Sequence, residues 1–166
     1  MKNSKGFSIV ETIVVMALLA ILSAIAVPSL IGQRNNANIR DAVSMIRGDF
    51  EMARSRAIRE NAFVPVIINT DGYTIFIDDG SGGGVAENWV RDGGERILCN
   101  RKLPTGIQIG LTQTTFPANV TNDAKITRFN GRGYIANTGI LTLLGLNGKA
   151  ATVDMNNRFG RIATYY

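Results

Sequence analysis

The feature that most constrains this chain is a long apolar run close to its N-terminus. No charged residue occurs between Thr12 and Val27. Taken from Phe7 to Leu30 the segment has 24 residues, which as an α-helix would span about 36 Å. The hydrocarbon core of a membrane is about 30 Å thick. The run is therefore long enough to cross a membrane as one helix.

Glu11 is the only charged residue within this segment. A carboxylate inside a membrane helix costs about 2.5–3.5 kcal/mol, so it needs a partner. A secretory signal would end its apolar region in a small-residue cleavage site, whereas here Gly6 precedes the run, after Lys2 and Lys5. Cleavage after Gly6 would keep the apolar helix on the mature protein and create an amino group at Phe7. That amine is a candidate counter-charge for Glu11, in the same subunit or in a neighbour.

Gly6, Phe7, Glu11, the apolar run and Pro28 together resemble the class III signal of type IV pilins and type II secretion pseudopilins. The resemblance implies that a prepilin peptidase removes leader residues 1–6 and that Phe7 is N-methylated. It also implies that helix 7–30 anchors the chain in the bacterial inner membrane, with residues 31–166 outside the cytoplasm. The helix would then pack against other pilins or pseudopilins in a filament, with Glu11 and Pro28 as its assembly residues and Glu11 paired to a neighbouring N-terminus. A plain membrane anchor or an uncleaved signal is the alternative, and it leaves Glu11 without a role.

The composition restricts the available chemistry. The chain has no histidine, which excludes Ser-His-Asp and Cys-His catalysis and any His-ligated metal site. Cys99 is the single cysteine, which excludes a CxxC redox pair, a Cys-rich zinc site and an internal disulfide. We expect Cys99 to be a small buried residue in a strand. These observations predict no catalytic residue, metal or cofactor, and they leave a membrane-anchored enzyme as the less favoured class.

The segment from Asp78 to Gly84 places carboxylates beside glycines, as hard-cation sites do. Counted from Asp79, however, the calcium-loop spacing fails, because Gly83 and Val90 stand where acidic residues are required. We therefore expect a surface loop. Trp89 follows in the same loop, and it either packs on the sheet, which we favour, or lies at a subunit contact.

Helical periodicity resumes after Pro28, so this proline is expected to kink the helix and not to end it. Six apolar positions then step by four and three, as on one face of an amphipathic helix. They are Ile39, Val43, Ile46, Phe50, Ala53 and Ala57. We predict one helix from about Phe7 to Asn61, with this stripe facing a sheet.

Strand-like runs follow the helix. Residues 63–68 and 73–77 flank the Asp71-Gly72 turn signal and predict a hairpin, in which Pro65 indicates an edge strand or an irregular start. Further strands are predicted near residues 96–99, 107–111, 126–129, 139–144, 151–155 and 161–165. The fold class is therefore α+β: a pilin-like fold with a long N-terminal helix, part membrane and part amphipathic, packed on antiparallel sheet.

The soluble part resembles the GspH/FimT branch of the pilin superfamily. The similar segments are Phe50–Asn61, Tyr73–Asp78, Asp92–Leu98, Ile126–Gly131 and Gly139–Leu143. This resemblance implies a minor pilin or pseudopilin, which is a non-catalytic subunit incorporated into, or priming, a type IV pilus or a type II secretion pseudopilus.

The positive charge is concentrated at the C-terminal end. Residues 1–123 carry 12 Lys/Arg and 12 Asp/Glu, so the net charge of +5 belongs to residues 124–166, where Asp154 is the only acid. Such asymmetry is typical of an anionic partner and also of a solvated cationic face. In the FimT branch a C-terminal Gly-Arg-x-Arg pattern is associated with DNA binding in natural transformation. Here Gly160-Arg161 matches, but Ala163 replaces the second arginine. The candidate DNA-binding residues are Arg132, Lys149, Arg158 and Arg161.

Overall fold

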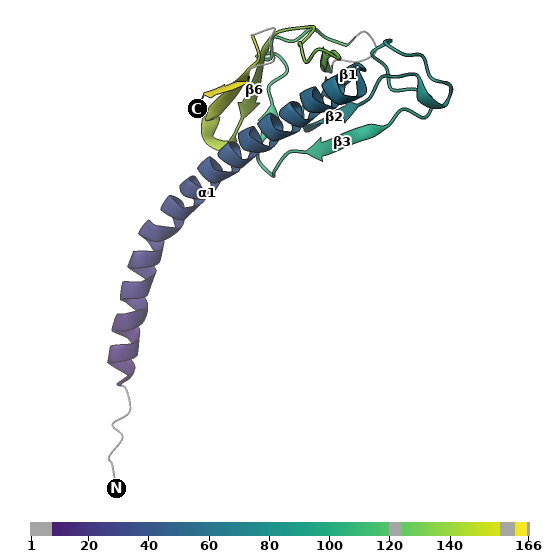
Figure 1. The fold of residues 1–166 in the computed structure, drawn as a ribbon. Coiled ribbons are helices and arrows are strands. Elements are labelled where there is room, and N and C mark those ends of the chain that lie inside the picture. Colours follow the sequence, from purple (N-terminus) through teal and green to yellow (C-terminus); the bar gives the residue numbers. More distant parts are fainter. Residues whose placement is uncertain (1–7, 120–123, 157–161, 166) are drawn as a thin grey trace. The chain divides into compact units, whose positions relative to one another are not determined.

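The structure is a computed structural model, and it describes residues 8–119, 124–156 and 162–165 (Figure 1). Its elements are helix α1 (Ile9–Glu60), strands β1 (Val64–Ile68), β2 (Gly72–Phe76), β3 (Ile97–Lys102), β4 (Gln108–Ile109), β5 (Lys125–Phe129), β6 (Ile140–Leu144), β7 (Ala150–Asp154) and β8 (Ala163–Tyr165), and short 3-10 turns η1 (Ser81–Gly83) and η2 (Leu146–Gly148). The chain divides into two compact units, residues 1–37 and residues 38–166, and α1 contributes to both.

The prediction of one long helix is confirmed. The helix does not end at Pro28, which lies inside α1. It ends at Glu60, because Asn61 adopts a left-handed conformation with φ of 47°. The Ala62 N–H then donates to the Ala57 carbonyl at 3.2 Å, which is the hydrogen bond of a Schellman cap. Asparagine tolerates this conformation better than most residues, so the local sequence explains where the helix stops.

The strands of the second unit form two four-stranded antiparallel sheets. The first sheet has the order β3-β2-β1-β5 and the second the order β4-β6-β7-β8. The predicted hairpin is confirmed, with β1 and β2 paired from Val66↔Ile75 to Ile68↔Tyr73. Each of the other predicted strands is also present within a few residues of its expected range.

The edge position considered for Pro65 is wrong, because β1 lies between β2 and β5 in the sheet. The alternative expectation, an irregular start of strand β1, is confirmed. Pairing of β1 with β5 includes Pro65↔Arg128, whereas pairing with β2 begins only at Val66. Proline has no N–H to donate, so the β1–β2 ladder cannot continue through this residue. The next contact beyond it is the isolated bridge between Phe63 and Asp78.

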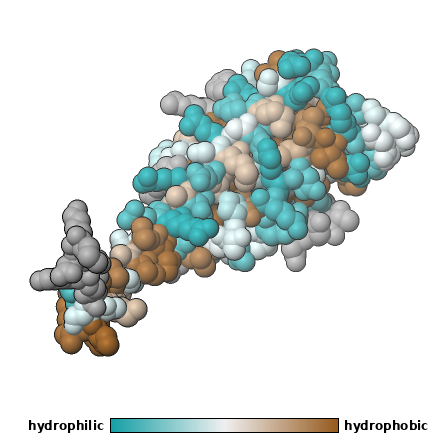
Figure 2. Space-filling view, turned by 90° about the horizontal axis from the view of Figure 1, so that it is seen from below, coloured by the Kyte–Doolittle hydropathy of each residue, from teal (hydrophilic) through white to brown (hydrophobic). Residues whose placement is uncertain are grey.

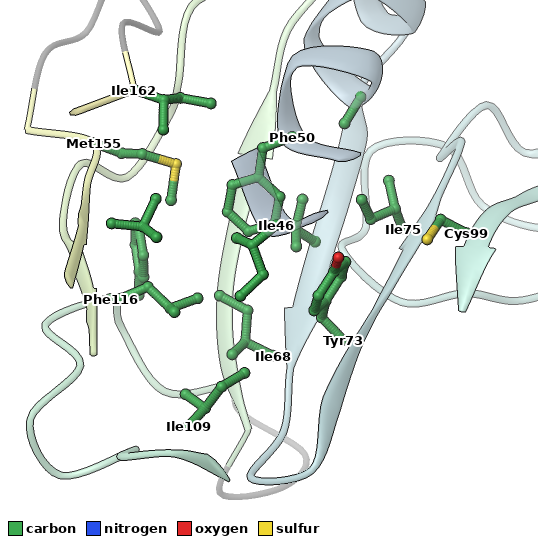
Figure 3. Close-up of a cluster of buried hydrophobic side chains, with 14 of the residues drawn as sticks. Ile46, Phe50, Ile68, Tyr73, Ile75, Cys99, Ile109, Phe116, Met155 and Ile162 are labelled. Carbon is green, nitrogen blue, oxygen red and sulfur yellow. The ribbon is translucent and has the colours of Figure 1, made fainter. Parts of the chain in front are cut away.

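The amphipathic stripe forms the centre of the core. All six predicted positions are buried, and Ala42 is buried with them. Figure 3 shows Ile46 and Phe50 of α1 lying between Ile68 and Tyr73 on one side and Phe116 and Met155 on the other. Phe50 makes an edge-to-face contact with Tyr73, with ring centroids 5.8 Å apart. Complete burial of each large apolar side chain contributes about 1.5–3 kcal/mol, so this stripe holds residues 38–60 of α1 on the sheets.

Candidate functional site

The first half of α1 exposes its apolar side chains. Ile9 is 79% exposed, Ile25 is 72% exposed and Leu30 is 62% exposed. No residue is buried in the most apolar 18-residue window, and by length and composition α1 is the one helix in the described residues that could cross a membrane. This surface appears as brown atoms at the lower left of Figure 2. Exposure of apolar surface to water costs about 25 cal/mol per Å², so this segment is suited to contact lipid or other apolar helices.

Both sequence-predicted assembly residues belong to this segment. Glu11 lies in the first turn of α1 and is exposed. Pro28 lies farther along the helix and is also exposed. The predicted processing residues, Gly6 and Phe7, lie outside the described residues, so the proposed pairing of the Phe7 amine with Glu11 stays a prediction.

A polar cluster in the second unit joins α1 to the first sheet. The Asp49 carboxylate on α1 accepts a hydrogen bond from the Tyr73 hydroxyl of β2 at 2.7 Å and from the Arg101 Nε of β3 at 2.9 Å. The Cys99 thiol of β3 donates to the same Asp49 oxygen at 3.3 Å. One carboxylate on the helix therefore connects two neighbouring strands to it.

The cluster shifts the pKa values of its members. Burial alone would raise the pKa of Asp49, but hydrogen bonds from Arg101, Tyr73 and Cys99 outweigh it, and the net shift is downward. Burial, followed by the neighbouring Asp49 charge, raises the pKa of the Cys99 thiol to about 11. Cys99 is buried in a strand as predicted, and its thiol stays protonated at neutral pH. The thiolate is the reactive form of cysteine, so this environment makes Cys99 unreactive.

The carboxylates of the 78–95 loop bind backbone amides. Buried Asp78 accepts from the N–H of Glu87 at 2.6 Å and of Trp89 at 3.0 Å. Asp92 accepts from the Val85 N–H at 3.0 Å. The carboxylate of Glu95, which is also buried, accepts from the N–H groups of residues 80 and 92 at 3.1 and 3.2 Å. Among the described residues, no group of three or more acidic or sulfur side chains is placed to hold a metal ion.

Trp89 packs on a cation and lies outside the main apolar cluster. The Arg128 guanidinium of β5 lies 3.9 Å from the ring centroid of Trp89 and 3.9 Å from that of Phe63. Burial lowers the pKa of Arg128, and the nearby carboxylates of Asp78 and Glu87 offset this only partly. Two aromatic faces around one guanidinium provide the cation–π attraction that makes up for lost hydration.

The candidate DNA-binding residues are only partly described, because Arg158 and Arg161 lie outside the described residues. Lys149 is exposed in the β6–β7 connection, where its carbonyl accepts from the Gly145 N–H at 2.8 Å. Gly145 in turn packs against the Ile39 side chain near the start of the soluble part of α1.

Arg132 lies at the other end of the soluble part of α1. Its neighbour Gly133 packs against Ile58 in the last turns of the helix. The segment from Ile39 to Ile58 is about 28 Å long at ~1.5 Å per residue. The structure therefore does not bring Arg132 and Lys149 together into one cationic surface.

The sequence did not predict the Asp49 cluster or the packing of Arg128 between Phe63 and Trp89. Asp49 falls beside the apolar stripe of α1, where it is indistinguishable from a solvated residue. The hydroxyl of Tyr73, which needs a polar partner when the ring is buried, was the available signal. For Arg128, no local pattern in the sequence points to either Phe63 or Trp89.

Two family models match the chain. Residues 1–27 match the prokaryotic N-terminal methylation motif. Residues 42–158 match the model described as type II transport protein GspH. A long N-terminal helix on antiparallel sheets, behind a methylation motif, defines a pilin-like protein. The GspH match covers more than half of the chain, and the chain therefore belongs to the GspH family.

Solved structures share this fold. The minor pseudopilin EpsH from the type 2 secretion system of Vibrio cholerae superposes with a TM-score of 0.55 at 12% identity, covering 77% of this chain and 96% of EpsH. The type IV minor pilin FimU of Pseudomonas aeruginosa superposes with a TM-score of 0.56 at 14% identity, covering 82% of this chain and 92% of FimU.

A curated relative matches over a shorter stretch. The type IV wide pilus major component PilA4 of Thermus thermophilus is 45% identical over 38 residues, which is 23% of this chain. The match spans only 29% of the length of PilA4. This chain and PilA4 are therefore similar over one short segment, and the similarity does not cover the whole of either protein.

Proposed function

We propose that this chain is a minor subunit of a type IV pilus or of a type II secretion pseudopilus, and that its work is assembly without catalysis. One observation carries the proposal: α1 buries an apolar stripe on the sheets in its second half and exposes apolar side chains in its first half. The second half is part of a folded head. The first half suits a membrane and then the apolar core of a filament.

In this proposal a prepilin peptidase cuts between Gly6 and Phe7, and Phe7 becomes the methylated N-terminus. The methylation-motif match over residues 1–27 supports this step. Residues 7–30 then hold the subunit in the inner membrane, with residues 31–166 on the extracytoplasmic side. Release into the filament exchanges lipid contacts for contacts with other pilins or pseudopilins, and Glu11 and Pro28 lie in the segment that makes this exchange.

Glu11→Ala is expected to lower the amount of this subunit in sheared filaments about tenfold or more. The new amine at Phe7 would lose its counter-charge, and an unpaired charge in an apolar core costs about 2.5–3.5 kcal/mol. Quantitative immunoblotting of sheared filaments, normalised to total cellular subunit, measures the effect.

The matched control is Thr12→Ala, which alters the next position without removing a charge. Both variants should be processed normally and keep the fold of residues 38–166, because Glu11 and Thr12 lie in the other unit. An undiminished level of the Glu11→Ala subunit in filaments of normal number contradicts the role given to Glu11.

A second role in DNA binding rests on the concentration of positive charge in residues 124–166. The full-length chain in detergent should then bind duplex DNA with an affinity that falls steeply with salt, because each neutralised phosphate releases counterions. Replacing Arg158 and Arg161 together by alanine is expected to weaken binding to all sequences alike and to flatten the salt slope by about two contacts. Fluorescence anisotropy at several salt concentrations measures both effects.

Replacing Arg40 and Arg47 of α1 by alanine removes the same charge elsewhere and serves as the control. The DNA role requires that replacing Arg158 and Arg161 lowers the affinity for DNA clearly more than this control does. No detectable binding at about 0.1 mM protein, the weak end of non-specific affinity, removes the DNA role and leaves the filament subunit alone.

A further inference from the structure

The chain itself keeps one end of the head (residues 38–166) close to the apolar segment of α1. Ile39 is the first buried residue along this helix, whereas Leu30 is still exposed. The two residues are nine positions apart, which is about 14 Å along a helix. The headgroup layer of a bilayer extends about 5–8 Å beyond each side of the hydrocarbon core. With residues 7–30 in a membrane, the surface around Ile39 is therefore within a short distance of lipid, whichever way the two units are oriented.

Two segments form the surface around Ile39, residues 102–108 and residues 144–149. Gly145 of the second segment packs against the side chains of Ile39 and Ile107. A groove of about 370 Å³ lies between the two segments. These two segments are called the proximal end of the head below, because the chain holds them nearest to the apolar segment.

The groove at the proximal end has a largely apolar lining with an exposed leucine at its rim. The apolar side chains in the lining are those of Leu103, Pro104, Ile107, Leu144 and Leu146. Leu146 packs beside Gly106 and is nevertheless 52% exposed. The interfacial layer of a membrane favours such a side chain, because apolar atoms leave water there.

Lysine side chains flank this apolar surface. Lys102 lines the groove and Lys149 follows it in the chain, and both residues are exposed. Asp71 is the one acidic residue in the lining. No salt bridge joins Lys102 to an acidic residue within the described part of the chain. Apolar side chains with lysines beside them are the combination that binds the surface of an anionic membrane.

We propose that the proximal end contacts the anionic lipid surface of the membrane that anchors the chain, with Leu146 in the interfacial layer and Lys102 and Lys149 at lipid phosphates. The inference rests on the proposed function in one respect, the location of residues 7–30 in a membrane. Lipid is favoured over a separate acidic protein because the anchor keeps this surface at a high effective concentration of lipid. The contact holds the head against the membrane before assembly and breaks when the subunit enters a filament.

Quenching of a fluorescent dye by lipid tests the contact. The full-length Thr105→Cys protein carries a nitrobenzoxadiazole dye at position 105, which is exposed in the groove. Cys99 is buried and its thiol stays protonated, so it does not take the label. The protein is reconstituted in vesicles of phosphatidylethanolamine with about one third phosphatidylglycerol, an anionic lipid. A lipid with a nitroxide on its headgroup is expected to lower the emission about twofold or more.

Ser55→Cys with the same dye is the control for distance. Ser55 is exposed on α1, about 24 Å beyond Ile39 at ~1.5 Å per residue. Its dye should lose little emission in the same vesicles. Quenching at position 105 that is no stronger than at position 55 would overturn the proposal.

Charge reversal tests the role of the lysines. Lys102→Glu combined with Lys149→Glu should remove most of the quenching at position 105, and neutral phosphatidylcholine vesicles should do the same to the protein without this reversal. Arg59→Glu combined with Arg132→Glu, the same reversal at the other end of the head, should leave the quenching unchanged. Undiminished quenching in the lysine variant or in neutral vesicles would overturn the proposal.

Flotation of the vesicles on a density gradient separates this inference from the proposed function. Protein that floats with the vesicles but shows no quenching at position 105 overturns the contact alone. Protein that does not float overturns the membrane location of residues 7–30, and the contact with it.

Discussion

Gly6→Val is expected to abolish processing, so that nearly all of the protein keeps an N-terminus at Met1 or Lys2. Glycine offers the peptidase a cleavage site without a side chain, whereas the branched valine side chain would clash with the enzyme that binds this backbone closely. The precursor should still insert in the membrane, because the apolar run from Thr12 to Val27 is unchanged. Intact-mass spectrometry of the purified subunit distinguishes the two forms.

Ser4→Val is the matched control, because it places the same side chain within the leader but away from the cleavage site. It should be processed to Phe7. If the Gly6→Val protein begins at Phe7 as efficiently as the wild type, the N-terminal segment has been misinterpreted. Filament incorporation should fall together with processing, since the uncleaved leader would keep Lys2 and Lys5 in front of the segment that enters an apolar core in the proposed function.

Asp49→Ala is expected to lower the free energy of unfolding by about 2–3 kcal/mol. The Tyr73 side chain is 1% exposed, and its hydroxyl donates to Asp49 at 2.7 Å. Removing the acceptor would leave a buried donor unsatisfied and would release Arg101 from α1. Urea unfolding of the full-length protein in detergent measures the change. Asp41→Ala, at an exposed position on the same helix, should stay within about 0.5 kcal/mol of the wild type.

The difference in the free energy of unfolding between the wild type and Asp49→Ala is expected to depend on pH. The pKa of Asp49 is lower in the folded state than its ordinary value of 3.8. Its contribution to stability is therefore complete above the unfolded-state pKa and is lost as pH falls through the folded-state pKa. The stability difference between the wild type and Asp49→Ala should stay constant at neutral pH and shrink in acid. Asp49→Asn, which keeps an acceptor and loses the charge, should lie between them at neutral pH. A difference that widens in acid would contradict the assigned contacts.

The local sequence was sufficient for every element whose pattern is complete within a short stretch. The apolar positions from Ile39 to Ala57 repeat with the helical period, so they predict both the helix and its buried face, and the structure confirms both. The turn at Asp71-Gly72 likewise predicts the β1–β2 hairpin, because residues adjacent in the chain form it. The apolar run of the N-terminal segment identifies a membrane-compatible helix for the same reason: length and composition alone decide it.

Tertiary structure decided everything that depends on residues far apart in the chain. β5 pairs with β1 across more than fifty residues of sequence, which places Pro65 on an interior strand and leaves only the irregular start of the two alternatives that the sequence offered. The same pairing brings Arg128 between Phe63 and Trp89. Arg132 and Lys149 are close in the sequence but separate in space. Pairing and packing over such distances depend on the summed burial of many side chains, which no single motif encodes. For this reason the sequence by itself determined the helix and its likeness to pilins, and only the fold determined the Asp49 cluster and the packing of Arg128 between Phe63 and Trp89.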